Sequence, residues 1–188
     1  MGENSEQNGI MIAIVRSLDD PENLGRVKLE IPTLEHQETD WARIAAPMAG
    51  GGRGFFFRPE VGDEVLIALE HGDPRRAYVV GALWSKTDKP PEDDGDKTGN
   101  NWRFMVSRCG HMIKLDDTQG AEKIELIDKD KKCRVVIDSK NNKIQLTADS
   151  GNIEISAQAG KISLTAASID IKATTGAVTI QGAQVNIN

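Results

Sequence analysis

The C-terminal half of this 188-residue chain lacks the residue types that most globular cores use. After Phe104 there is no Phe, Trp, Tyr or Pro, although the preceding residues hold all eight aromatic residues and all seven prolines. A single domain with one mixed core distributes such residues along the whole chain. The absence therefore predicts two regions that are built on different plans.

Long apolar runs are also missing, and none approaches the roughly 20 residues that a membrane-spanning helix requires. The first residues are polar and acidic, unlike a signal or transit peptide, and Glu6 stands where a myristoylation motif requires Ser or Thr. Cys109 and Cys133 are too few for a disulfide scaffold or a four-ligand zinc site. We expect both thiols to be reduced in the cytoplasm.

Basic residues are scarce in the N-terminal half. Residues 1–100 carry 11 Lys and Arg against 19 Asp and Glu, whereas residues 101–188 carry 12 against 10. Nucleic-acid binding draws much of its strength from basic residues that contact phosphates. The acidic N-terminal half therefore argues against a nucleic-acid partner.

Alternation of apolar and polar residues predicts short β-strands in the N-terminal half, and no helical periodicity interrupts it. The five predicted strands are Ile10–Val15, Gly25–Ile31, Trp41–Ala45, Glu64–Leu69 and Ala77–Leu83. Five short strands in about 75 residues fit a small closed barrel of the oligonucleotide/oligosaccharide-binding (OB) type. The glycine-rich segment 49–54 lacks the spacing of a phosphate-binding loop and predicts a flexible connector between strands.

A stretch rich in proline and acidic residues separates the two halves and predicts a linker, because it cannot bury enough apolar surface to order itself. The expected organisation is a polar segment at 1–9, the OB-fold domain at 10–86, the linker at 87–104 and a spike domain at 105–188.

An internal repeat fills the C-terminal half, in which aliphatic pairs at positions i and i+2 recur nine times at steps of 7–11 residues. Each pair lies on one face of a short strand. The pairs are Ile113/Leu115, Ile124/Leu126, Val135/Ile137, Ile144/Leu146, Ile153/Ile155, Ile162/Leu164, Ile169/Ile171, Val178/Ile180 and Val185/Ile187. The pattern predicts an array of strands and not a globule.

One copy of this array has no opposing layer for its aliphatic stripe. A single-chain β-helix usually needs about 20 residues or more per coil, and a plain antiparallel meander is a thin sheet with exposed edges. Three chains wound around one axis solve both problems, so we expect an intertwined triple-stranded β-helix, a homotrimeric prism in which each strand pairs with another chain. The expected trimer core comprises Ile144, Leu146, Ile153, Ile155, Ile162, Leu164, Ile169, Ile171, Val178 and Ile180.

Several ordered segments resemble one known family: Gly25–Lys28, Trp41–Pro47, Phe57–Leu66, Glu70–Arg76, Tyr78–Trp84 and Ser107–Thr118. They are similar to the OB domain and the start of the β-helix in contractile-tail spikes, the group of phage baseplate assembly protein V and the VgrG spike of type VI secretion. The resemblance covers nearly the whole chain. It implies a homotrimer with an OB collar on a baseplate hub and a β-helix that points at the target membrane.

The chain departs from some members of this family. Its linker has no room for a lysozyme domain, and only nine residues precede the first predicted strand, which implies a separate hub protein. No histidine lies near the C-terminus, where some phage spikes carry an iron-binding His-x-His apex. The blunt end implies a platform for a separate PAAR-repeat tip protein, with candidate contacts at Val185, Asn186, Ile187 and Asn188.

Exposed-looking aromatic and basic residues of the OB region are the candidate hub contacts. Phe55, Phe56 and Phe57 are consecutive, and three consecutive side chains cannot all face one core. We name Phe55, Phe56, Arg75 and Arg76 as candidate hub contacts.

No residue pattern indicates catalysis. Cys109 and His111 at i and i+2 of a strand lie about 7 Å apart, too far for the hydrogen bond of a nucleophile–base pair. Asp116 and Asp117 face opposite sides of a strand and cannot flank one glycosidic bond, so a turn role is expected. The trio of Asp63, His71 and Asp73 is explained by a turn between strands.

The sequence therefore predicts a structural, membrane-piercing spike of a contractile injection machine, not an enzyme, with no cofactor and no metal. Its expected partners are two further copies, a hub protein, a PAAR-repeat tip protein and, transiently, the target membrane. We expect cytoplasmic assembly followed by incorporation into a virion or an extracellular particle. The alternatives are an OB-fold nucleic-acid or glycan binding module on a trimeric stalk, and a β-helical enzyme acting on polysaccharide.

Overall fold

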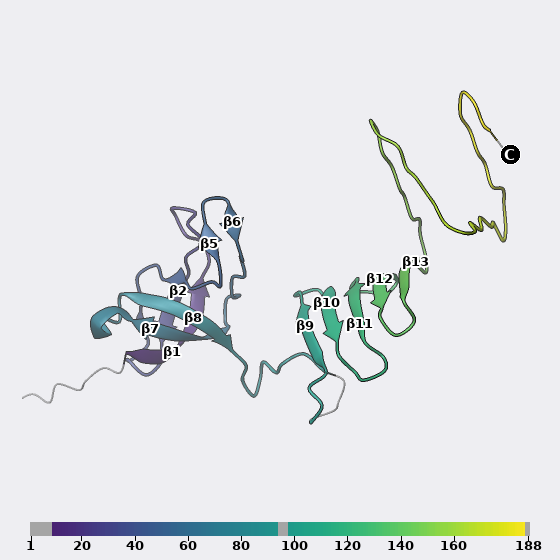
Figure 1. Ribbon diagram of the computed structural model, residues 1–188. Helices are drawn as coiled ribbons and strands as arrows, with labels where there is room; N and C mark the ends of the chain where they lie inside the picture. The colour runs from purple at the N-terminus through teal and green to yellow at the C-terminus, as the bar shows by residue number, and fades with distance from the viewer. Residues whose placement is uncertain (1–8, 94–97, 187–188) are drawn as a thin grey trace, which may run out of the picture. The chain divides into compact units, whose positions relative to one another are not determined.

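The computed structural model describes residues 9–93 and 98–186 and, within those ranges, contains β-strands and one short 3-10 helix (Figure 1). The all-β class predicted from the sequence is confirmed. The chain divides into two compact units, Met1–Gly95 and Asp96–Asn188.

Six strands of the N-terminal unit form one sheet in the order β3-β2-β1-β7-β8-β4. Their bounds are β1 Ile10–Ser17, β2 Lys28–Ile31, β3 Gln37–Glu38, β4 Arg43–Ile44, β7 Glu64–Leu69 and β8 Ala77–Leu83. β1 runs antiparallel to both β2 and β7, whereas β4 runs parallel to β8. Val27 and Ala42 form a bridge that joins the chain just before β2 to the chain just before β4. This bridge brings strands from opposite ends of the sheet order together, consistent with the predicted OB-type barrel.

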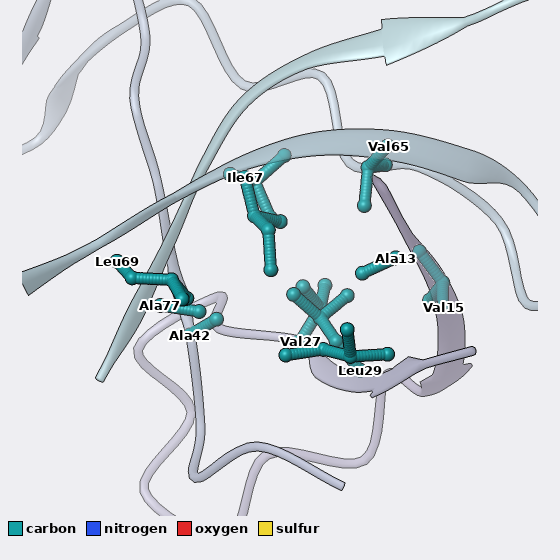
Figure 2. Close-up of a cluster of buried hydrophobic side chains, with 11 residues drawn as sticks. Ala13, Val15, Val27, Leu29, Ala42, Val65, Ile67, Leu69 and Ala77 are labelled. Atoms are coloured by element: carbon teal, nitrogen blue, oxygen red, sulfur yellow. The ribbon is translucent and has the colours of Figure 1, made fainter. Parts of the chain in front are cut away.

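The core of this unit consists of side chains that alternate along the strands and converge from facing segments on one interior (Figure 2). β1 contributes Ala13 and Val15, and β7 contributes Val65, Ile67 and Leu69. Each larger aliphatic side chain contributes about 1.5–3 kcal/mol when it is fully buried. The other buried members are Val27, Leu29, Ile31, Ala42, Ala77 and Val79.

The loop between β1 and β2 is organised around the buried carboxylate of Asp20. This carboxylate accepts backbone N–H groups, including that of Leu24 at 2.9 Å, and binds the Arg26 guanidinium at 2.7 Å. The Arg26 guanidinium holds the pKa of Asp20 well below its ordinary value. The predicted strand at Gly25–Ile31 is therefore too long, because Gly25 and Arg26 belong to this loop and β2 begins at Lys28.

The glycine-rich segment forms a hairpin, which corrects the prediction of a flexible connector. β5 Ala49–Gly50 pairs antiparallel with β6 Arg53–Gly54. Gly54 has a φ of +142°, and a Cβ at this position would lie only 2.5 Å from the Met48 carbonyl oxygen. Glycine is thus required for the close backbone approach, and the pairing depends on backbone atoms that composition alone does not reveal. The 3-10 helix Glu70–Gly72 between β7 and β8 was also not predicted.

Five strands of the C-terminal unit form an antiparallel meander in the order β13-β12-β11-β10-β9 (Figure 1). Their bounds are β9 Trp102–Val106, β10 Met112–Asp116, β11 Lys123–Ile127, β12 Cys133–Asp138 and β13 Lys143–Ala148. The prediction that every strand pairs with another chain is wrong for residues 102–148. Here the short turns between strands let each strand pair with its neighbour in the same chain.

β9 begins inside the range 87–104 that was predicted as a linker, so the linker prediction is wrong for residues 102–104. Trp102 and Phe104 alternate with Arg103, and the two rings meet edge to face with centroids 6.2 Å apart. This packing keeps the segment in the sheet. The described residues after β13, 149–186, are assigned no strand, and their side chains are exposed.

Candidate functional site

One face of the C-terminal sheet is predominantly aliphatic, although Arg103 of β9 lies on it opposite Leu115. The strand register places Ile113 opposite Leu126 and Leu115 opposite Ile124, and the same pairing continues through β12 and β13. We call this surface the aliphatic face. Its members are Met105, Ile113, Leu115, Ile124, Leu126, Val135, Ile137, Ile144 and Leu146.

Nothing in the described part of the chain covers the aliphatic face. Apart from half-buried Val135, its side chains are between 41% and 75% exposed. Contiguous apolar patches of this kind on a soluble protein mark interaction sites, because isolated exposed residues are common but an entire apolar sheet face is not. The pairs predicted from the repeat do share one face here, and that face is available to a partner.

The opposite face of the same sheet, which we call the polar face, carries charges of alternating sign. Asp116, Lys123, Asp138 and Lys143 lie directly opposite one another in successive strand pairs. Opposite charges in cross-strand pairs stabilise this register. A slip of one strand by two residues would separate these charge pairs, and a slip by one residue would move the charged side chains to the aliphatic face. The two faces therefore differ in chemistry: one is aliphatic and exposed, and the other is charged and contains the buried side chains of Lys114, Asp116 and Glu125.

A buried ion cluster lies on the polar face beneath Trp102. The Lys114 ammonium is 2.5 Å from Glu125 Oε2 and 3.6 Å from Asp116 Oδ2. It also lies 4.0 Å from the centroid of the Trp102 ring, a cation–π contact. Sequence reasoning missed this cluster, although the alternation of Lys114 with Ile113 and Leu115 is the signal that places it opposite the aliphatic face.

Asp116 shows how the turn after β10 is held. Burial alone raises the pKa of Asp116. Hydrogen bonds from the Thr118 side chain and backbone, together with the Lys114 and Lys123 ammonium groups, lower the pKa by more than burial raises it, so the net shift is downward. Thr118 Oγ1 donates to Asp116 Oδ1 at 2.6 Å. Asp117 points elsewhere and pairs with Arg103 at 2.9 Å. The structure thus agrees with a turn role for this acidic pair.

The predicted trimer-core residues fall into two groups. Ile144 and Leu146 lie in β13 on the aliphatic face. The other eight lie after β13, where the described chain has no strands, and all of them are exposed: Ile153, Ile155, Ile162, Leu164, Ile169, Ile171, Val178 and Ile180. The chain by itself does not bring these eight residues into a core.

The predicted hub contacts fall into exposed aromatic residues and arginines that are paired with acidic residues. Phe55, Phe56 and Phe57 are all exposed, and the rings of Phe55 and Phe57 are stacked with centroids 6.4 Å apart. Arg75 and Arg76 lie in the β7–β8 connection, where Arg75 pairs with Asp73 at 3.0 Å and Arg76 lies 3.8 Å from Glu70. These two arginines already have acidic partners within the unit.

Of the predicted tip contacts, Val185 and Asn186 are exposed, and the Gln184 side chain donates to Asn186 Oδ1 at 3.0 Å. Ile187 and Asn188 lie outside the described residues.

The candidate nucleophile and base do not form a pair. Cys109 lies in the turn before β10 and not on a strand, and its thiol is 3.7 Å from Ser107 Oγ. The His111 Nδ1 atom accepts the backbone N–H of Lys129 at 3.2 Å. In the N-terminal unit, Asp63 accepts the backbone N–H of Glu60 at 2.8 Å and Asp73 is paired with Arg75, so both serve local turns.

Neither described range holds three His, Cys, Asp or Glu residues grouped closely enough to bind a metal ion. Across residues 9–93 and 98–186 there is also no helix with the length and apolar character needed to cross a membrane.

Comparison with known proteins gives a match over the N-terminal unit. Residues 11–84 match the family described as the type VI secretion system/phage-baseplate injector OB domain. The type VI secretion system spike proteins VgrG1a and VgrG1b of Pseudomonas aeruginosa are each 26% identical to this chain over 111 residues, which is 53% of this chain. The aligned region is 17% of VgrG1a and 15% of VgrG1b, so the chain spans only a small part of the relatives it matches.

Proposed function

We propose, from the premise that residues 11–84 are an OB domain of the injector family shared by type VI secretion systems and phage baseplates, that this chain is the membrane-piercing spike of a contractile injection machine. The family is structural and not enzymatic, and its relatives are spike proteins. The observation that carries the proposal is the uncovered aliphatic face of the C-terminal sheet.

Three copies of the sheet supply the missing layer. If each sheet forms one side of a triangular prism, the three aliphatic faces meet on a shared axis and the three polar faces point outward. Burying each aliphatic side chain contributes about 1.5–3 kcal/mol, so three sheets with nine members each gain far more than association costs. Aromatic side chains are too bulky for the middle of so narrow a prism, which accounts for their absence after Phe104.

The segment after β13 suits an intertwined continuation of this prism. Its aliphatic pairs keep steps of 7–9 residues, yet the single chain forms no strand there, and β13 has a neighbour on only one side. A strand from a second copy can pair with the free edge of β13. The triple-stranded β-helix expected for 105–188 is therefore proposed for 149–188 only, on top of a prism of intrachain sheets.

The mechanism is mechanical. Contraction of a sheath supplies the force, and an interlocked trimer transmits it because many backbone hydrogen bonds must break together before any one chain can extend. We propose that the N-terminal unit sits on a baseplate hub protein and that residues 185–188 contact a PAAR-repeat tip protein. Assembly takes place in the bacterial cytoplasm before the particle engages the target membrane.

Oligomeric mass tests the proposal directly. Light scattering coupled to gel filtration is expected to give three times the 20.5 kDa chain mass, and an unboiled sample is expected to migrate as a trimer in SDS gels. A folded monomer in dilute buffer contradicts the proposal.

Disulfide trapping tests the intertwined part separately. In a background with both native cysteines replaced by serine, Gln145→Cys is combined with Glu154→Cys, because each lies between the two members of an aliphatic pair and therefore on the outward face of its expected strand. Interchain pairing predicts covalent multimers on oxidation, with each single-cysteine variant as the control. A trimer that yields only intrachain disulfides rejects the intertwined continuation but keeps the prism.

A further inference from the structure

Three neighbouring strands of the N-terminal sheet are apolar on both of their faces. β1, β7 and β8 bury one set of side chains in the core, and the alternate side chains point away from it. The register places Ile12 opposite Leu66 and Ile10 opposite Ala68 on this outward side. An antiparallel strand with one solvated face alternates apolar and polar residues, so strands that are apolar on both faces indicate a covering layer.

We call this surface the outer sheet face, and its apolar members are Ile10, Ile12, Ile14, Leu66, Ala68 and Val80. Ile10, Ile12 and Val80 are between 48% and 63% exposed, and no described segment covers them. Glu64 lies on the same face, directly opposite Ile14 and Leu83. Within residues 9–93 and 98–186, the Glu64 carboxylate has no ion-pair partner.

A second exposed apolar surface, the phenylalanine segment of residues 53–57, is built from other parts of the same unit. Its three phenylalanines are between 54% and 74% exposed. The Phe55 backbone N–H donates to the Met48 carbonyl oxygen at 3.0 Å. The Phe56 ring rests against Gly25, where a Cβ would lie only 2.8 Å from Phe56 Cε2. The hairpin β5–β6 and the β1–β2 loop thus hold these rings at the surface.

The two surfaces carry opposite charges that lack partners. Arg53 opens the phenylalanine segment, is exposed and has no ion-pair partner in the described part of the chain. Glu64 is the matching anion of the outer sheet face. Complementary charges favour one placement of two surfaces over others. The hollow beside Phe56 has both signs of charge, since Asp19 and Arg58 line it, and so it does not select a partner by charge.

A closed ring of three copies needs two different surfaces on each copy. Around a threefold axis, one surface of a copy meets another surface of the next copy, and the ring closes after three such contacts. The N-terminal unit presents two uncovered apolar surfaces with opposite charges. In the proposed trimer, residues 84–101 tether each unit to a C-terminal sheet, which keeps the local concentration of the three units in the millimolar range.

We infer that, within the trimer, the phenylalanine segment of one copy packs on the outer sheet face of the next copy, with Arg53 paired to Glu64 across the contact. The inference rests on the proposed spike function, because that function brings three copies together. Contact between acidic copies also requires surfaces that do not repel. β1, β7 and β8 carry only Arg16 and Glu64 as charged residues, and residues 41–59 contain no Asp or Glu.

A second copy fits these surfaces better than a hub protein. Phe55 and Phe56 are also predicted hub contacts, and a hub could cover the phenylalanine segment alone. It would not account for a second uncovered surface of opposite charge on the same unit. A neighbouring copy covers both surfaces in one repeated contact. Experiments on the purified chain separate the two occupants, because no hub protein is then present.

Disulfide trapping tests the contact in the full chain. In a background with both native cysteines replaced by serine, Phe57→Cys is combined with Ile12→Cys or with Val80→Cys, which leaves Phe56 in place. Oxidation is expected to give covalent trimers on boiled, non-reducing SDS gels. Each single-cysteine variant is expected to migrate as a monomer, because the contact joins unlike surfaces. Phe57→Cys with Gln37→Cys, an exposed position on β3, is the matched control and is expected to remain uncrosslinked.

Charge reversal tests the pairing of Arg53 with Glu64. In the trapping background, Arg53→Glu or Glu64→Arg alone is expected to lower the yield of covalent trimer at low salt by about threefold or more, because each places like charges together. The double reversal restores opposite charges and is expected to restore the yield. The same reversals in the Gln37→Cys control should change nothing.

Light scattering on the same samples separates this inference from the spike proposal. A trimeric mass without covalent trimers from either cysteine pair overturns the inference and leaves the spike proposal standing. Trapping that is equally efficient with the Gln37→Cys control, or a double reversal that fails to restore the yield, also overturns it. A monomeric mass overturns the spike proposal, and the inference falls with it.

Discussion

Ile137 and Ile144 lie directly opposite each other in the β12–β13 pair, and yet they are 42% and 75% exposed. Ile137 lies in an inner strand and Ile144 in an edge strand of a five-stranded sheet, so backbone hydrogen bonding is largely satisfied while side-chain packing is not. The C-terminal unit is thus paired strand to strand within the sheet, but no second layer covers the aliphatic face of that sheet among the described residues.

Placing a charge on the aliphatic face is expected to abolish the trimer. Ile144→Asp puts a carboxylate from each chain next to the shared axis, where an unpaired charge is strongly unfavourable. Gln145→Asp is the matched control, because it changes the adjacent residue of the same strand on the polar face. Light scattering should show loss of trimer for the first variant only. Trimers in both variants contradict the assignment of the inward face.

The segment after β13 is expected to gain protected backbone amides only in the assembled state. Hydrogen exchange of residues 149–186 should be slow in the trimer, because their strands form between chains. Leu164→Asp should make this segment exchange rapidly, whereas Thr165→Asp, on the opposite face of the expected strand, should not. Rapid exchange in the intact trimer counts against the intertwined continuation.

The buried Lys114–Glu125 pair is expected to stabilise the sheet only as a pair. Lys114→Met leaves Glu125 charged and buried, and breaking a pair of this kind costs about 3–5 kcal/mol. The double variant Lys114→Met with Glu125→Leu should recover most of this loss, because the buried Glu125 charge is removed and Asp116 keeps Lys123 as its cationic neighbour across the strand pair. Denaturant unfolding of the four members of this mutant cycle measures the coupling. If the two single changes lower the unfolding free energy additively in the double variant, the two residues are not coupled.

Stability of the N-terminal unit is expected to depend on Glu30 at low pH. Hydrogen bonds from Arg16 and His36 lower the pKa of Glu30 to about 2 from an ordinary value of 4.5. The carboxylate binds fewer protons in the folded state, so its contribution is complete above pH 4.5 and is lost as the pH falls towards 2. Glu30→Gln should flatten this part of the curve of unfolding free energy against pH. If Glu30→Gln leaves the slope of unfolding free energy against pH unchanged, Glu30 is not the group responsible for this pH dependence.

Local pattern predicted much of the strand content. β7 and β8 have the bounds expected from alternation, and the aliphatic pairs from Ile113 to Leu146 share one face as expected. Prediction failed at two places where contacts that composition does not reveal decide the structure. The two-residue strands β5 and β6 depend on glycine backbone contacts, and β9, in which the Trp102 ring packs against Phe104, lies partly in the predicted linker.

Part of the candidate site could be named from sequence and part could not. The sequence predicts exposure within the run Phe55 to Phe57 because three consecutive side chains cannot face one core, but the hydrogen bond from Arg58 Nη2 to the Leu18 carbonyl oxygen joins residues 40 positions apart. The alternation that exposes Ile113 and Leu115 also places Lys114 on the other face, yet its partners Glu125 and Trp102 lie on different strands. Such partners follow from register and not from spacing along the chain.

The sequence by itself determined that this chain is all-β, that it has two dissimilar halves and that its second half carries an aliphatic stripe of period two, because alternation is a local property of each strand. Only the tertiary structure decided which strands are neighbours. Residues 102–148 pair within one chain because closing the short turns between neighbouring strands costs little conformational entropy. This intrachain pairing leaves one sheet face without a covering layer among the described residues.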